Sequence, residues 1–342
     1  MVEAVVILGA GSSADFGVPV LANIFSDIHA RAYLRQNPAL LGMLNDLFWK
    51  PRGYSLATYD QSLNIEQMLT VLKDWERERN IPSDSKPKDI PGFRRGLYVL
   101  IQKAVFEGKS SNARHLNSLI DICEKTFEHT TWASFNWDCI FEASFWYRIP
   151  WGLGPGTRNN PKLAISVVDW HTGLQNHLFL KLHGGINWWL IDDKITYLPF
   201  TGGGTLREKW DRYDRDPDMK DRPVILEPSF YKYEDSAYKQ LAPQWEMFFQ
   251  KLIEADCVII VGYSLPEMDI NARSRILTAF QVNRKCRWLV VDQSESTCNL
   301  YRRLLGCEHV TVLQQSLASF NNEIRGHMQT AFPELTFSDQ QL

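Results

Sequence analysis

Short runs of apolar residues recur along the chain, and longer segments with the spacing of amphipathic helices lie between most of them. None of these runs alternates cleanly between apolar and polar positions, which is typical of parallel strands that helices cover on both faces. The runs are VVIL at Val5, TTWASF at Thr130, LFLKLH at Leu178, PVIL at Pro223, CVIIVG at Cys257, RWLVVD at Arg287 and VTVL at Val310. Helical spacing is found in 236–254, 267–281, 295–305 and 316–329. The pattern predicts an α/β fold: a mostly parallel sheet with helices on both faces.

Two regions interrupt this alternation. Residues 22–126 show only helical spacing, as in NIEQMLTVLKDWERER and GFRRGLYVLIQKAVFEG, which the polar, proline-bearing NIPSDSKPKDIP separates. Region 150–222 holds the turn-rich IPWGLGPGTRNNP, a hairpin pattern in INWWLIDDKITYLPF, and the glycine- and charge-rich TGGGTLREKWDRYDRDPDMKDRP, which predicts a loop. We expect a single domain, 1–342, in which 1–21 and 127–330 form the sheet core, 22–126 a helical insertion and 150–222 a lid.

Composition excludes several classes of protein. The 37 basic and 40 acidic residues give a net charge of -3, so bulk charge offers no argument for a nucleic-acid or membrane partner. The six cysteines stand singly without a CxxC pair, which favours reduced thiols over a disulfide framework or a zinc site. The chain shows no secretory leader, and no run approaches the roughly eighteen apolar residues of a membrane span. A cytoplasmic protein is expected.

The first strand runs into a glycine-rich turn. Gly9, Gly11 and Ala14 match G-x-G-x-x-G/A, in which small residues let backbone amides approach a pyrophosphate in a Rossmann-like fold. A tight turn without a ligand is the alternative. A hydride-transferring enzyme would also place an acidic residue at the end of its second strand, about twenty residues on. Asp27 has that spacing, but its segment NIFSDIHARAYLRQ reads as helix, which disfavours a dehydrogenase.

Polar residues follow four of the other predicted strands, and the carboxyl ends of parallel strands are where open α/β sheets bind ligands. Two of these positions have other interpretations, because Asn and Asp often cap the next helix and a single histidine is often structural. The residues are Asn136 and Asp138 in SFNWDCIFE, His183 before two glycines in LKLHGG, Gly262, Tyr263 and Ser264 in CVIIVGYSLPEMD, and Asp292 in RWLVVDQS.

The order of these motifs, GAGS, NxD, HG, GYS and an apolar strand ending in aspartate, resembles the Sir2 (sirtuin) superfamily from Val5 to about Gln293. The resemblance implies a fold that binds NAD+ and breaks its nicotinamide–ribose bond instead of moving a hydride. It implies His183 as general base, Asn136 at the nicotinamide ribose or a water, and Asp138 at the carboxamide. It also implies Gly9, Ala10, Gly11, Ser12, Gly262 and Ser264 at the phosphates and Asp292 at the adenosine ribose, where a carboxylate would favour NAD over NADP.

The sequence departs from the protein deacylases of that superfamily at two places. Those deacylases continue GIP with Asp-Phe-Arg, whereas Gly17-Val18-Pro19 is followed here by Val20-Leu21-Ala22, and they carry two CxxC pairs that bind zinc. The pattern is more similar to the SIR2-like NAD hydrolases (NADases) of bacterial anti-phage defence, which act in abortive infection. That similarity implies hydrolysis of NAD+ to nicotinamide and ADP-ribose, without zinc.

Two alternatives stay open: a protein deacylase or ADP-ribosyltransferase with an acceptor groove near 222–230, and a non-catalytic subunit that senses NAD or ADP-ribose. Because an unregulated NADase would kill its own cell, we expect a homo-oligomer or a sensor partner to control it. A HerA-type ATPase and a short Argonaute are candidates by analogy alone.

Overall fold

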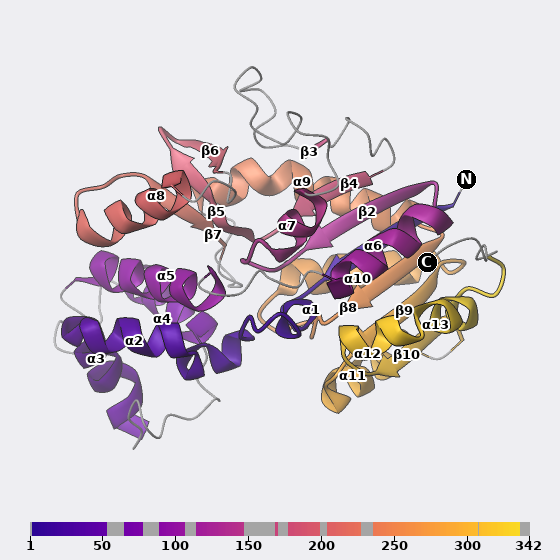
Figure 1. The fold of residues 1–342 in the computed structure, drawn as a ribbon, viewed down its shortest axis with the longest axis horizontal. Coiled ribbons are helices and arrows are strands. Elements are labelled where there is room, and N and C mark those ends of the chain that lie inside the picture. Colours follow the sequence, from indigo (N-terminus) through magenta and orange to yellow (C-terminus); the bar gives the residue numbers. More distant parts are fainter. Residues whose placement is uncertain are drawn as a thin grey trace.

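The computed structural model describes residues 2–52, 65–77, 89–106, 114–146, 168–169, 177–198, 204–226, 235–306 and 308–335. Two expected segments fall mostly outside these residues: the turn-rich stretch 149–161 and the polar stretch 80–91. Part of the expected acceptor groove, 227–230, and Cys307 also lie outside them. Figure 1 shows a large sheet with its helices on the right, and a helical lobe and a small sheet on the left.

The large sheet has seven strands in the order β10-β9-β8-β1-β2-β4-β3. Six of them run parallel, and the two-residue β3 pairs antiparallel with β4. The strands are β1 (Glu3–Leu8), β2 (His129–Ser134), β3 (Val168–Asp169), β4 (His177–Lys181), β8 (Cys257–Val261), β9 (Arg287–Asp292) and β10 (Val310–Gln314). Counted along the chain, the six parallel strands follow the doubly wound order of a Rossmann-like fold. The predicted fold class is confirmed.

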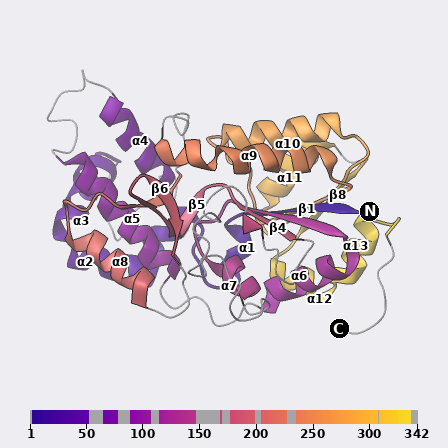
Figure 2. The ribbon, with the colours of Figure 1, turned by 90° about the horizontal axis from the view of Figure 1, so that it is seen from above.

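Helices cover both faces of this sheet, which explains why its strands are apolar throughout. Residues Ala4 to Leu8 of β1 are each at most 1% exposed, and Val5 lies between Thr131 of β2 and Val258 of β8. One face carries α9 (Ser236–Glu254) and α10 (Ile270–Val282), and the other carries α6 (Arg114–Thr126), α12 (Leu317–Asn322) and α13 (Ile324–Ala331) (Figure 2). Helix α11 (Glu295–Leu305) packs against β9 and β10. The expected helix 316–329 is thus two helices, which meet at Glu323.

The helical lobe forms from the region that showed no strand pattern. It contains α2 (Ile28–Gln36), α3 (Pro38–Leu44), α4 (Ile65–Arg77) and α5 (Ile90–Phe106), and α5 packs against the other three. Leu34, Leu69 and Phe93 are fully buried in it. Asp27 accepts hydrogen bonds from the amides of His29 (2.9 Å) and Ala30 (3.1 Å), so it caps α2 and does not end a strand. Helix α6, by contrast, packs against strand β2 of the large sheet and against helix α12.

The small sheet has three antiparallel strands in the order β6-β5-β7. They are β5 (Gly184–Ile191), β6 (Lys194–Tyr197) and β7 (Arg222–Ile225). The hairpin predicted in INWWLIDDKITYLPF is confirmed as β5 and β6. Its two-residue turn places Asp192 and Asp193 at φ values of 48° and 59°, the left-handed conformation that tight hairpin turns require.

Two expectations for this region are wrong. The run PVIL at Pro223 was expected in the parallel sheet, but it forms β7, in which Ile225 pairs antiparallel with Gly184. A four-residue apolar run fits a buried strand of either kind, so the pattern alone could not assign its sheet. The charge-rich stretch expected as a loop contains helix α8 (Gly204–Arg215). Its buried residues Leu206, Trp210 and Tyr213 follow helical spacing, which the surrounding charges obscured.

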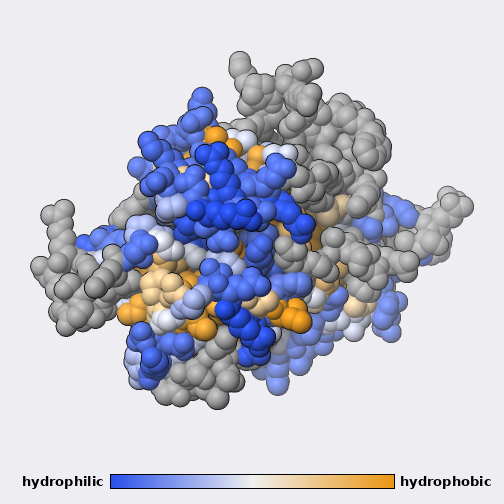
Figure 3. Space-filling model, turned by 60° about the vertical axis from the view of Figure 1, so that its left-hand side comes forward, coloured by the Kyte–Doolittle hydropathy of each residue, from blue (hydrophilic) through white to orange (hydrophobic). Residues whose placement is uncertain are grey.

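The left-hand side of the molecule, brought forward in Figure 3, is mostly hydrophilic, with hydrophobic side chains gathered in a band across its lower half. No helix in the described part of the chain combines the length and hydropathy that a membrane span needs.

Candidate functional site

The predicted site residues gather at the carboxyl edge of the large sheet, where the strand order reverses direction between β1 and β8. Here the loops after the two strands are joined by their backbones: the Gly9 amide donates to the Val261 carbonyl (3.0 Å) and the Gly11 amide to the Gly262 carbonyl (2.9 Å). Such a switch point is where doubly wound sheets bind dinucleotides. The topology therefore places the glycine turn where a ligand is expected.

Contact between these two loops accounts for the glycines themselves. Gly262 has a φ of 61°, and a Cβ atom there would lie 2.2 Å from the Ser12 nitrogen; a Cβ on Gly9 would lie 2.4 Å from the Gly262 oxygen. The amides of Ser12 and Ser13 donate to the carbonyls of Gly9 and Ala10, at 2.9 and 3.1 Å. Because the turn already uses these amides, the side chains around it decide whether the site holds a ligand.

Asn136 is the side chain that joins β2 to the glycine turn. It is 7% exposed, and its Nδ2 donates to the Gly9 carbonyl (2.9 Å) and to the hydroxyls of Ser13 (3.1 Å) and Ser12 (3.2 Å). Its Oδ1 is buried without a hydrogen-bond partner among the described residues. Leaving a buried acceptor unsatisfied costs about 1–3 kcal/mol, so this oxygen points to a bound donor.

A buried ion pair stabilises the loop that carries Asp138. Oδ1 of Asp138 accepts from the Ile140 amide (2.9 Å) at the start of α7 (Ile140–Trp146), so the capping interpretation holds for this oxygen. Lys181 of β4 donates to the Asp138 carbonyl and to the Glu142 carboxylate. Burial is the largest single effect and favours a neutral Lys181, but the charges of Glu142, Cys139 and Asp138 and the hydrogen bond to Glu142 together outweigh it and raise the pKa of Lys181. The pair fixes the loop that carries Asn136 and Asp138.

His183 follows β4, the neighbour of β2, and is 5% exposed. Its ring packs edge-on against Phe135 with centroids 5.1 Å apart, and Phe135 stacks on Tyr263 of the β8 loop at 4.3 Å. Nε2 of His183 lies 3.0 Å from Oδ2 of Asp269, a residue that is fully buried. The Tyr263 hydroxyl donates to the same Asp269 oxygen (2.8 Å). The Nε2–Oδ2 contact is an ion-pair contact without hydrogen-bond geometry, so Asp269 acts on the imidazole through its charge.

The helical lobe contributes a second acidic residue, Glu66, close to Asp269. Burial, and then the negative charge of Asp269, raise the pKa of Glu66 on α4 to about 8. Glu66 is therefore largely protonated at neutral pH, which keeps a second negative charge away from Asp269. The lobe thus takes part in the electrostatics of the site.

The sequence analysis singled out neither Asp269, Glu66 nor Lys181. Asp269 stands where an acid usually caps a helix, yet the structure shows no capping hydrogen bond from its side chain to α10. Lys181 did carry a signal, since a lysine within a buried strand needs a partner. Glu66 carried none, because it lies on an amphipathic helix far from the other motifs in sequence.

The remaining predicted residues lie at the rim. Ser264 is exposed and Asp292, at the end of β9, is partly exposed. Oδ1 of Asp292 accepts from the Ser294 amide (2.8 Å), and burial raises the pKa of the carboxyl group. Gly9, Ser12, Asn136 and Gly262 are thus in direct contact, while His183 joins them through Phe135 and Tyr263. Across the described residues, no three His, Cys, Asp or Glu side chains are arranged to hold a metal ion.

Neither a protein-family model nor a curated protein matches this chain. Solved structures do resemble it. A Sir2 homologue in complex with NAD matches at 13% identity over 96% of this chain and 90% of that chain, with a TM-score of 0.49. A mutant Sir2 homologue in complex with 2'-O-acetyl ADP ribose matches at 14% identity over 96% and 92%, with a TM-score of 0.48. Likenesses of this size carry no argument about activity, which rests on the geometry above.

Proposed function

We propose that this chain is a Sir2-type enzyme that binds NAD+ and hydrolyses its nicotinamide–ribose bond. One observation carries the proposal: at the switch point of the sheet, Asn136 is hydrogen-bonded to the glycine turn while its buried Oδ1 lacks a partner among the described residues, and His183 follows the neighbouring strand. A ribose hydroxyl or a water would supply the donor that Oδ1 lacks. A binding turn without catalysis would have no need of His183.

The protein has three tasks in this reaction: it holds the nicotinamide carboxamide, positions the ribose or the attacking water, and accepts the proton that the water loses. Cleavage passes through an oxocarbenium-like state in which nicotinamide leaves as a neutral molecule. Water then adds to the anomeric carbon and loses a proton. We assign Asp138 to the carboxamide, Asn136 to the ribose or the attacking water, and His183 to the proton. The products are nicotinamide and ADP-ribose.

Asp269 supports the assignment of His183. A carboxylate 3.0 Å from one ring nitrogen stabilises the imidazolium that proton transfer produces. Tyr263 restrains the Asp269 oxygen in turn. Asp269 is a positioning residue, because it acts through His183 and not on the substrate.

For Gly9, Ala10, Gly11, Ser12, Gly262 and Ser264 we retain the phosphate role, and for Asp292 the adenosine-ribose role. The turn's own hydrogen bonds imply that phosphates approach it from the exposed side of Ala10, Gly11 and Ser264. Depletion of NAD+ in anti-phage defence, with control by a second copy or a sensor partner, completes the proposal. It rests on the motif order and on the absence of Asp-Phe-Arg after Pro19.

Product analysis tests the reaction type. The purified chain is incubated with NAD+, with and without an acylated lysine peptide, and nicotinamide, ADP-ribose and cyclic products are resolved by chromatography. Equal release of nicotinamide and ADP-ribose in both incubations supports hydrolysis. Release that depends on the peptide would instead identify a deacylase or transferase. Binding of NAD+ without any release would indicate either a sensing subunit or an enzyme that still requires its partner.

A further inference from the structure

A cavity of about 400 Å³ lies between the helical lobe and the small sheet. Its walls come from α4, α5, the segment after α8, strand β7 and the start of α9. This volume lies within the range of small-molecule sites in proteins. None of the residues assigned to NAD+ lines it.

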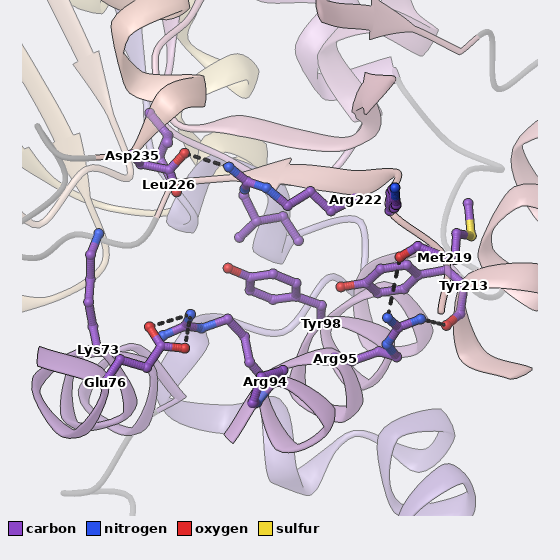
Figure 4. Close-up of a pocket in the computed structure, with 13 residues that line it drawn as sticks. Lys73, Glu76, Arg94, Arg95, Tyr98, Tyr213, Met219, Arg222, Leu226 and Asp235 are labelled. Atoms are coloured by element: carbon purple, nitrogen blue, oxygen red, sulfur yellow. Dashed lines mark hydrogen bonds and ion pairs between the residues drawn. The ribbon is translucent and has the colours of Figure 1, made fainter. Parts of the chain in front are cut away.

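Positive charge converges on this cavity from four separate segments. The described residues that line it include five basic side chains and two acidic ones: Lys73, Arg94, Arg95, Lys220 and Arg222, against Glu76 and Asp235. Each acid is already engaged. Glu76 accepts two hydrogen bonds from Arg94 (2.7 and 2.9 Å), and Asp235 accepts one from Arg222 (2.7 Å). Tyr98 lies between the Arg222 guanidinium above it and the Arg94–Glu76 pair below it (Figure 4).

Arg95 is fixed in place without being neutralised. Its guanidinium donates to the backbone carbonyls of Tyr213, Asp216, Pro217 and Met219, which carry no net charge. Both terminal nitrogens are used in these bonds, so Arg95 contributes its charge to the cavity. It also lies over the Tyr213 ring, 4.5 Å from the centroid. Burial raises the pKa of Tyr213 to about 12 despite Arg95, Arg222 and Arg94 nearby, so that hydroxyl supplies no anion at neutral pH. Arg95, Lys73 and Lys220 thus leave the cavity with an excess of positive charge.

We propose that this cavity binds a small, multiply charged anion that carries phosphate groups. Guanidinium and ammonium groups from separate elements surround such an anion and form short, charge-assisted hydrogen bonds to its oxygens. The occupant would bridge α4 and α5 to β7. Strand β7 also borders the candidate catalytic site: Ile225 pairs with Gly184, and the Leu226 amide donates to the His183 carbonyl (2.9 Å). The bound anion would therefore lie across one strand from His183.

Calorimetric titration of the full chain with inorganic pyrophosphate tests the proposal. The variant is Lys73→Gln/Lys220→Gln, because one lysine is partly and the other fully exposed, so their loss leaves the core intact. The matched control is Lys285→Gln, an exposed lysine in the connection between α10 and β9. We expect the double variant to weaken binding about tenfold or more, the control to stay within about twofold, and affinity to fall with added salt.

Parallel titrations with ADP separate the two sources of such an anion. Equal affinity for ADP and pyrophosphate assigns an inorganic or generic phosphate ligand, and tighter binding of ADP assigns a nucleotide; both support the proposal if the lysine variant weakens them. Pyrophosphate binding that survives in the lysine variant would come from another site, such as the glycine turn, and overturns the proposal. Binding of a polyglutamate peptide without binding of pyrophosphate also overturns it, in favour of an acidic protein partner.

Discussion

The two sheets of this protein make their tight turns in different ways. The large parallel sheet uses glycine, because its loops after β1 and β8 touch through their backbones and a Cβ atom has no room. The small antiparallel sheet turns through Asp192 and Asp193, which adopt a left-handed conformation with side chains in place. Substitutions of the loop glycines of the large sheet are therefore expected to disturb the candidate site. The turn of the small sheet is expected to tolerate substitution.

His183 stands where the two sheets join. Its chain leaves β4 of the large sheet, and two residues later it is paired with β7 of the small one. Gly184 has a φ of 67°, and a Cβ there would lie 2.0 Å from the Val224 oxygen. At this junction, as in the loops of the large sheet, a Cβ atom has no room.

The largest effect is expected for Gly262→Ala in the large sheet. The new Cβ would meet the Ser12 nitrogen at 2.2 Å on a backbone of left-handed φ, so the loops must separate. We expect the free energy of unfolding to fall by about 3 kcal/mol or more in urea denaturation. The matched control is Gly326→Ala in α13, where nothing lies within 4 Å; alanine should stabilise that helix by about 0.5–1 kcal/mol. Equal stability of the two variants would contradict the backbone argument.

Asp269→Asn tests the positioning of His183 and depends on the proposed function. The amide keeps the shape but loses the charge that steadies the imidazolium, so kcat for NAD+ cleavage should fall about tenfold to a hundredfold. KM should stay within about twofold, because Asp269 does not touch the substrate. Tyr263→Phe, which removes the hydrogen bond from the Tyr263 hydroxyl to Asp269 Oδ2, should cost less. A rise in KM with kcat unchanged would show that Asp269 shapes the binding site instead.

Glu66 should make stability depend on pH. Its pKa is about 8 in the folded chain against an ordinary value of 4.5, so the folded state holds a proton that the unfolded chain releases. The contribution of Glu66 to the free energy of unfolding is therefore complete below about pH 4.5 and declines as the pH rises toward 8. Glu66→Gln should flatten this decline, because glutamine has no proton to release.

Thermal unfolding of the wild type and of Glu66→Gln at pH 5 and pH 8 measures this difference. Glu246→Gln on α9, an exposed carboxylate, is the control and should leave the pH dependence unchanged. Parallel curves for the wild type and Glu66→Gln would show that Glu66 is solvated and lies outside the cluster.

The smallest effect is expected in the small sheet. Asp193→Gly relieves the left-handed backbone at φ 59° and should stabilise the protein by about 0.5 kcal/mol, measured as a higher urea midpoint. Asp193→Ala keeps a Cβ and should not gain. Destabilisation by glycine would mean that the aspartate side chain holds the turn, and would weaken the contrast between the two sheets.

The sequence predicted strand positions well but not which strands pair. Every apolar run became a strand, because a strand covered on both faces must be apolar along its length. The strand order depends on crossovers between distant segments, which local pattern does not encode, and this is why the run at Pro223 was assigned to the wrong sheet. Helix α8 was missed because its polar residues outnumber its three buried residues.

The candidate site was predictable where residues stand at strand ends and hidden where they do not. Gly9, Asn136, His183 and Gly262 all follow strands whose carboxyl ends share one edge. Asp269 reads as a helix cap, and Glu66 comes from a helix about 120 residues before His183, so only folding brings them together.

The central claim is that His183 and Asn136 at the switch point cleave NAD+. The most direct measurement compares nicotinamide release from NAD+ by the wild type, His183→Ala and Asn136→Ala, with NAD+ binding to each followed by calorimetry. The account predicts that the wild type releases nicotinamide, that both variants lose release by at least a hundredfold, and that His183→Ala still binds NAD+ within about threefold. Release by His183→Ala at the wild-type rate would contradict it.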